Sequence, residues 1–269
     1  MRANIYLHEF RTRIKSVLIW SLSVSALVLF FLSIFPTFAD QSALMNELLS
    51  KYPPALLEAF GLGKMDLSTV AGFYGFVFVF VQLCLAIQSG NFGFGLVSIE
   101  ENEMTADFLL TKPVTRLQVL NSKLISAFSS LLLTDLVVWV VSIVSILLFH
   151  DDRPYDLGLL VSLMLSIVIF QLFFLSVGLV VSLLVKRVRS VTPYSLGLGF
   201  GAYVLSAFSG VFGDVKLEYI TPFKQLDPLY FVQHAAYNTP LLLINLSITL
   251  VSLALSYWLY TRRDIPAVS

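Results

Sequence analysis

The chain has 269 residues, of which 57% are hydrophobic and only 13% are charged, whereas a soluble globular domain averages about 25% charged residues. This composition, with a mean hydropathy of +0.85, excludes an ordinary soluble protein and indicates a surface that faces lipid. The 17 basic and 17 acidic residues balance, so nothing favours nucleic-acid binding, and the single cysteine, Cys84, leaves no intrachain disulfide or cysteine-based metal site.

The first segment, residues 5–14, mixes apolar and charged residues at helical spacing. It predicts an amphipathic elbow helix lying in the cytoplasmic membrane interface. The alternative is a plain basic flank that enforces topology. The apolar run from Val17 is long and has no small-residue cleavage site before Pro36, so we expect an uncleaved first span and not a signal peptide.

A bilayer core about 30 Å thick requires about 20 apolar residues in a helix. Six runs meet this requirement: 16–38, 69–97, 119–149, 157–185, 190–212 and 239–261. Each run should be helical because lipid offers the backbone no hydrogen-bond partners. The sequence therefore predicts one all-α transmembrane domain, residues 1–269, with six spans.

The basic residues orient these spans, since Lys and Arg concentrate on the cytoplasmic side. Five lie in the connections of one side, namely Lys51, Lys64, Arg153, Lys216 and Lys224. The other twelve lie on the side that holds both ends of the chain. We therefore expect the N- and C-termini to be cytoplasmic.

A cytoplasmic segment of residues 100–112 connects the second and third predicted spans. It opens with acidic residues, continues with the apolar Phe108, Leu109 and Leu110, and ends at Pro113. Such a helix offers an apolar ridge to a protein partner. A helix that lies on the lipid surface fits the composition equally well.

This segment resembles the first cytoplasmic loop of ABC-2-type permeases, the membrane subunits of ATP-binding cassette exporters. The matching residues are Glu103, Thr105, Asp107, Phe108, Leu109, Leu110, Thr111, Pro113, Val114, Thr115, Arg116 and Lys123. A basic N-terminal elbow, six spans and an outer loop at 53–61 extend the likeness along the chain. Met104 departs from the pattern, because many relatives carry Gly there.

The resemblance implies that the segment is a coupling helix that docks on a separate ATPase subunit. The implied coupling residues are Glu103, Thr105, Asp107, Phe108, Leu109, Leu110, Pro113 and Arg116. It also implies an exporter in the plasma membrane, built from two permease copies, identical or related, and two cytoplasmic ATPases. ATP and Mg²⁺ would be bound by the ATPases, so we expect no cofactor in this chain.

Polar residues inside the predicted spans are candidates of a second kind, because burying them unpaired in lipid is costly. Asp135 lies in the middle of the third span, where it either serves a transport path or bonds another helix through Gln171, Asn245 or Gln82. Gln82, Gln88 and Asn91 follow one another at roughly helical spacing and are candidates for a central pathway.

The sequence contains no phosphate-binding loop, since Gly61-Leu62-Gly63-Lys64 has the wrong spacing. It also lacks a His/Glu zinc pattern and a nucleophile elbow. We therefore expect a permease and not an enzyme. The alternative is a secondary transporter or a non-transporting membrane assembly factor, with no ATPase partner.

Overall fold

A computed structural model describes residues 3–41, 47–48, 50–53, 57, 66–102, 114–185, 188–209 and 217–262. Throughout these ranges the regular elements are helices, and no strand occurs in them. The longer helices are α1 (Ala3–Asp40), α4 (Val70–Asn102), α6 (Arg116–Phe149), α7 (Leu157–Leu184), α8 (Val191–Phe208) and α11 (Thr239–Arg262). The short ones are η1 (Leu217–Tyr219), α9 (Pro222–Gln225) and α10 (Pro228–His234).

Five helices in the described part of the chain are long and apolar enough to cross a membrane: α1, α4, α6, α7 and α11. They coincide with five of the six predicted spans, so the all-helical prediction is confirmed. The remaining predicted span, 190–212, corresponds to α8. This helix has 18 residues, about 27 Å, and is not among the five.

The N-terminal segment differs from the expected elbow. Residues 5–14 are helical but continue without a break into the first span, so that α1 is one helix of 38 residues. The reason is local, because no Gly or Pro occurs between Ala3 and Phe35 and Pro36 comes only in the last turns.

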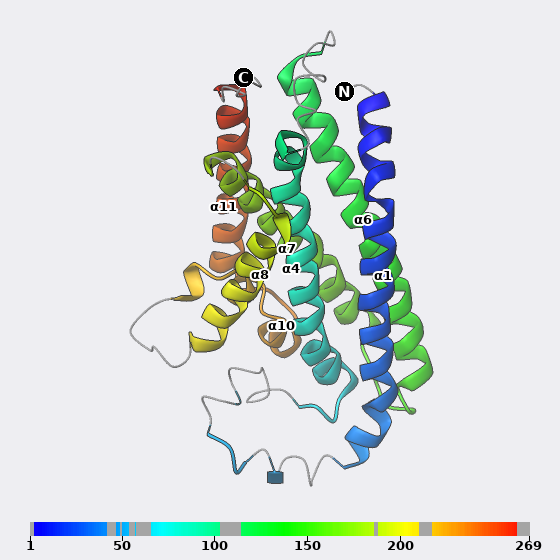
Figure 1. Cartoon of the computed structure of the whole chain (residues 1–269). Coiled ribbons are helices and arrows are strands. Elements are labelled where there is room, and N and C mark those ends of the chain that lie inside the picture. Colours follow the sequence, from blue (N-terminus) through cyan, green and yellow to red (C-terminus); the bar gives the residue numbers. More distant parts are fainter. Residues whose placement is uncertain are drawn as a thin grey trace.

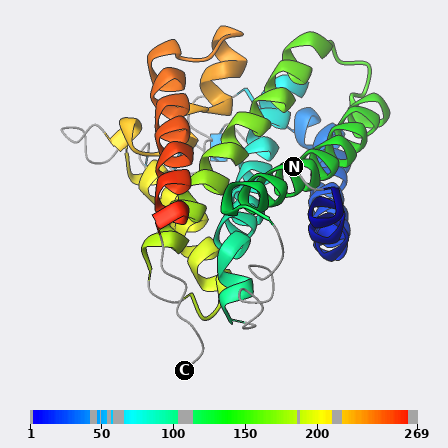
Figure 2. The same cartoon turned by 90° about the horizontal axis from the view of Figure 1, so that it is seen from above.

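The helices form an elongated bundle with both described chain ends at the same end of it (Figure 1). Helix α1 packs mainly against α6, whereas α4 packs against α7 and α8, and α7 packs against α11. Seen from above, α1 and α11 lie on opposite sides with α4 and α7 between them (Figure 2). The contact between α4 and α6 is much smaller than that between α1 and α6.

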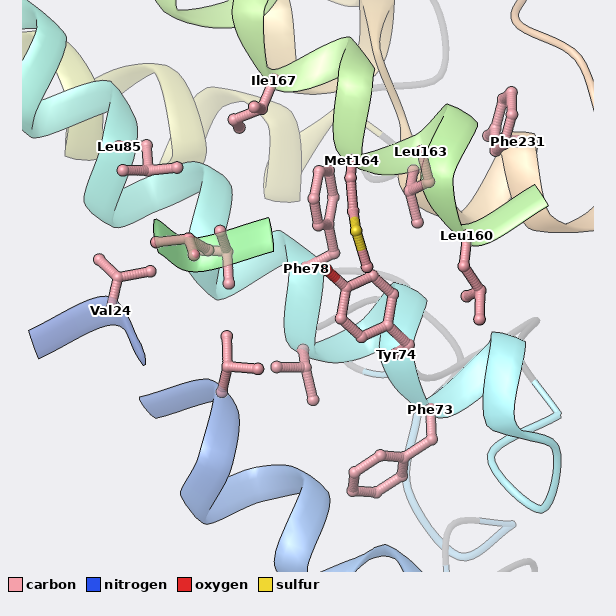
Figure 3. Close-up of a cluster of buried hydrophobic side chains, with 14 of the residues drawn as sticks. Val24, Phe73, Tyr74, Phe78, Leu85, Leu160, Leu163, Met164, Ile167 and Phe231 are labelled. Carbon is pink, nitrogen blue, oxygen red and sulfur yellow. The ribbon is translucent and has the colours of Figure 1, made fainter. Parts of the chain in front are cut away.

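The larger apolar core fills the half of the bundle remote from the chain ends. Figure 3 shows Tyr74 and Phe78 of α4 facing Met164 of α7, with Phe231 of α10 nearby. A smaller apolar cluster lies toward the chain ends and includes Leu96. Large apolar side chains also cover the outside, as at Leu22 and Phe30 of α1, which are 74% and 62% exposed.

The connection before α11, predicted as an outer loop, contains the three short helices. Pro222 and Pro228 occupy the first positions of α9 and α10, where their missing N–H groups cost nothing. Phe223, Leu226 and Phe231 are buried in the larger core. The connection therefore folds back against the bundle and forms part of its packing.

Candidate functional site

The predicted coupling segment joins the end of α4 to the start of α6. Its residues Glu103, Thr105, Asp107, Phe108, Leu109, Leu110 and Pro113 lie outside the described residues. The structure does describe the helices on both flanks. Their adjoining ends lie at the end of the bundle where α1 begins and α11 ends (Figure 1).

The start of α6 is defined by Thr115. Its side-chain oxygen accepts a hydrogen bond from the backbone N–H of Gln118 at 3.2 Å, and the Gln118 side chain accepts one from the Thr115 N–H at 3.3 Å. This reciprocal capping box satisfies two backbone donors that a helix start leaves open. The Thr115 of the family-like motif therefore has a local structural role, which is to begin α6 directly after the segment.

Arg116, the one predicted coupling residue that the structure describes, reaches the end of α11. Its Nη1 lies 3.5 Å from the carbonyl oxygen of Tyr260 and 3.4 Å from that of Thr261. The last carbonyls of a helix carry partial negative charge and favour a cation. One turn further along α6, the Asn121 side chain accepts a hydrogen bond from the Tyr257 hydroxyl. The start of α6 is thus tied to the end of α11.

A buried group of charges, the Glu9–Arg13–Lys123 cluster, ties the same part of α6 to α1 and α4. Lys123 Nζ lies 3.3 Å from Glu9 Oε1 and donates a hydrogen bond of 2.7 Å to the carbonyl oxygen of Leu96 in α4. The other Glu9 oxygen accepts a hydrogen bond of 2.8 Å from Arg13. The Arg13 guanidinium lies over the ring of Phe92, 5.4 Å from its centroid.

These charges are shielded from solvent, since the side chains of Lys123, Arg13 and Glu9 are 3%, 12% and 13% exposed. A buried ion pair is costly to form, and removing one partner leaves the other charge uncompensated. In the cluster this cost is offset by pairing: Lys123 contacts one carboxylate oxygen of Glu9 and Arg13 contacts the other. The Leu96 carbonyl oxygen is a further acceptor for Lys123. The cluster connects three helices, and its Lys123 lies about two turns from the start of α6 at Arg116.

The intramembrane candidate Asp135 is fully buried and faces α7. Of the three partners considered from the sequence, Gln171 is the one in contact, donating from Nε2 to Asp135 Oδ1 at 3.0 Å. Asn245 instead donates to Gln225 Oε1 at 2.8 Å. Asp135 Oδ2 has no hydrogen-bond partner in the described part of the chain.

The glutamines of α4 contact different elements. Gln88 donates to the Thr134 hydroxyl of α6 at 2.8 Å, and Gln82 donates to the carbonyl oxygen of Leu226 at 2.9 Å. Both are fully buried, whereas Asn91 is half-buried. The two glutamines therefore bond α4 to two different neighbours.

Two residues with prominent contacts were not selected as site residues from the sequence, namely Glu9 and Lys123. Lys123 belongs to the family-like motif. Its place inside the apolar run 119–149 indicates a buried contact, because a lysine inside an apolar run requires a partner. Glu9 and Arg13 lie four residues apart on a helix, which is the spacing of an ion pair. The contact between Glu9 and Lys123, however, spans more than one hundred residues of sequence and appears only in the folded chain.

Long apolar helices, polar groups bonded to one another inside the bundle, and an apolar exterior define a multi-span α-helical membrane protein. The model of the ABC-2 family transporter proteins matches residues 3–265, and the chain belongs to that family. It is accordingly a membrane permease subunit of an ABC transporter and not the ATPase, and such permeases normally work with a cytoplasmic ABC ATPase. A search of curated proteins found no match.

Proposed function

We propose that this chain is the membrane-spanning subunit of an ATP-driven exporter in the plasma membrane. It works as a pair of permease copies with two ATPase subunits, which bind ATP and Mg²⁺. The family match over residues 3–265 carries this proposal. The connected helix ends around the predicted coupling segment support it, because they offer a path from a cytoplasmic partner into the bundle.

The proposed topology has six spans with both termini in the cytoplasm. A chain that begins and ends at the same end of a bundle crosses it an even number of times, and the start of α1 and the end of α11 lie at the same end of the bundle (Figure 1). Five helices in the described ranges qualify as spans, and in this proposal α8 supplies the sixth crossing. Its length of about 27 Å approaches the hydrocarbon thickness of about 30 Å.

The ATPase docks on the predicted coupling segment, residues 100–112, in this proposal, with Phe108 as its apolar anchor. An aromatic anchor in a partner's groove often contributes about 2 kcal/mol or more, which is roughly a thirtyfold change in affinity. Glu103 and Asp107 are four residues apart, so in a helix they share a face and can meet basic residues of the partner. Closure of the ATPases on ATP would then act on α4 and α6.

Pull-down of the ATPase by two variants tests this function. Phe108→Ala and Asp107→Lys should release the ATPase, or leave it bound while uncoupling ATP hydrolysis from transport, without unfolding the spans. Phe30→Ala is the matched control, since Phe30 is 62% exposed on the apolar exterior of α1.

Two results contradict the proposal in different ways. If both variants retain the ATPase with normal stimulation of hydrolysis, the segment is not the coupling element. If the wild-type chain itself retains no ATPase, the secondary transporter or assembly factor becomes the better reading.

A further inference from the structure

The Glu9–Arg13–Lys123 cluster occupies a position that neither apolar packing nor helix capping explains. It lies where α4 enters the predicted coupling segment and α6 leaves it, and it includes the first turns of α1. These two flanking helices have little direct contact with each other. Polar links from α4 to α6 include the Lys123–Leu96 bond near the segment and the Gln88–Thr134 bond deeper in the bundle.

We propose that Lys123 is a positioning residue that joins α1, α4 and α6 into one unit, so that movement of the predicted coupling segment is passed to α1. This inference rests on the proposed function, because it assumes that an ATPase moves the segment. It adds the residues that carry the movement and names α1 as the helix that receives it.

The contacts of Lys123 connect three helices and not only one pair. One ammonium group contacts a backbone carbonyl of α4 at 2.7 Å and a carboxylate of α1 at 3.3 Å, while its own backbone belongs to α6. Arg13 holds the second oxygen of Glu9 at 2.8 Å, which fixes the orientation of that carboxylate. Because α1 also packs along α6, a displacement at its first turns is carried along the whole helix.

A movement passed to α1 should be detectable at its far end, next to Gln41, which is exposed. The experiment places a reporter cysteine there, Gln41→Cys, in a Cys84→Ser background, with the ATPase bound in lipid nanodiscs. The rate of labelling by a soluble maleimide is measured with and without a non-hydrolysable ATP analogue. Conformational coupling of ordinary strength predicts a change of about fivefold or more in the otherwise unaltered chain.

Lys123→Met keeps the length of the side chain and removes its charge. It should reduce the nucleotide-dependent change to less than about twofold while the ATPase stays bound. Lys123→Arg keeps the charge and should retain most of the change. Lys15→Met is the matched control, because Lys15 is exposed on α1, and it should behave as the parent chain.

If Lys123→Met does not fold, Glu9→Gln makes the same test, since it preserves the size of the side chain and removes only the charge. A merely structural role would lower the stability of these variants but leave the nucleotide-dependent change intact in the folded protein. Two results contradict the proposed role of Lys123. One is the full nucleotide-dependent change in labelling rate in a folded Lys123→Met or Glu9→Gln chain. The other is no such change in the parent chain with bound ATPase. Absence of bound ATPase in the parent chain contradicts the proposed function instead.

Discussion

At the scale of single residues, Asp135 illustrates how a carboxyl group is accommodated inside the bundle. It is fully buried, and Gln171 of α7 donates to one of its oxygens at 3.0 Å. Side-chain hydrogen bonds between membrane helices contribute modestly, about 0.6 kcal/mol on average. The contact is therefore suited to joining α6 to α7. The asparagine side chain also has an oxygen that could accept this hydrogen bond.

This leads to a prediction for Asp135→Asn. The asparagine carbonyl can accept the same hydrogen bond from Gln171, so we expect normal expression and assembly and transport within about twofold of the parent chain. Asp135→Leu removes the acceptor and should lower thermal stability in detergent. A transport path through Asp135 requires the opposite result, a well-folded Asn variant that no longer transports.

At the scale of elements, α4 and α7 approach each other closely at a glycine. A Cβ atom added at Gly93 would lie 2.3 Å from the carbonyl oxygen of Leu175, which belongs to the backbone of α7 and cannot move aside alone. At Gly197 of α8, by contrast, an added Cβ would meet nothing within 4 Å in the described structure. Small residues at membrane helix crossings allow such close backbone contact.

The two glycines provide a matched pair of alanine substitutions. Gly93→Ala should force α4 and α7 apart and cost about 1–3 kcal/mol, as overpacking of a tight core does. Gly197→Ala should be neutral or slightly stabilising, because alanine favours a helix over glycine by about 1 kcal/mol. Thermal unfolding of both purified variants measures this difference. Equal unfolding temperatures would show that α4 and α7 do not cross this closely.

At the scale of the whole molecule, α1 is held to the rest of the bundle by ionic contacts at both ends. Near its start, Glu9 contacts the buried Lys123. At its far end, Arg153 donates to Asp40 at 2.7 Å, with the Asp40 side chain 67% exposed. An exposed pair of this kind contributes little, about 0–1 kcal/mol. The buried end is therefore the one at which α1 is more firmly positioned.

The six-span arrangement predicts which positions a membrane-impermeant thiol reagent can reach. Cysteines at Ser50 and Asp152 should react in intact cells carrying a Cys84→Ser background, whereas cysteines at Thr111 and Ser190 should not. The structure shows Ser50, Asp152 and Ser190 exposed, so access and not burial decides their labelling. All four should react after permeabilisation. Labelling of the second pair in intact cells would invert or abolish the proposed topology.

The positions of the long helices and part of the candidate site could be predicted from the sequence. Five of the predicted runs are apolar helices of spanning length, and Gln171, one of the three partners considered for Asp135, is the one that contacts this buried carboxylate. The separate elbow was not found, because the sequence offers no helix breaker between it and the first span. The sequence analysis did not predict the short helices α9 and α10. Each has too few buried residues to show a helical pattern of apolar positions.

Hydropathy, helix formation and the asymmetry of basic residues are properties of the local sequence, because lipid obliges every apolar run of sufficient length to satisfy its own backbone. The sequence by itself therefore determined an all-helical membrane protein and where most of its helices lie. Only the tertiary structure decided which polar groups meet, as with Lys123, Glu9 and Leu96, since such contacts join helices distant in the chain. The physical reason is that a buried charge requires a partner, whereas the identity of that partner depends on which helix faces pack together.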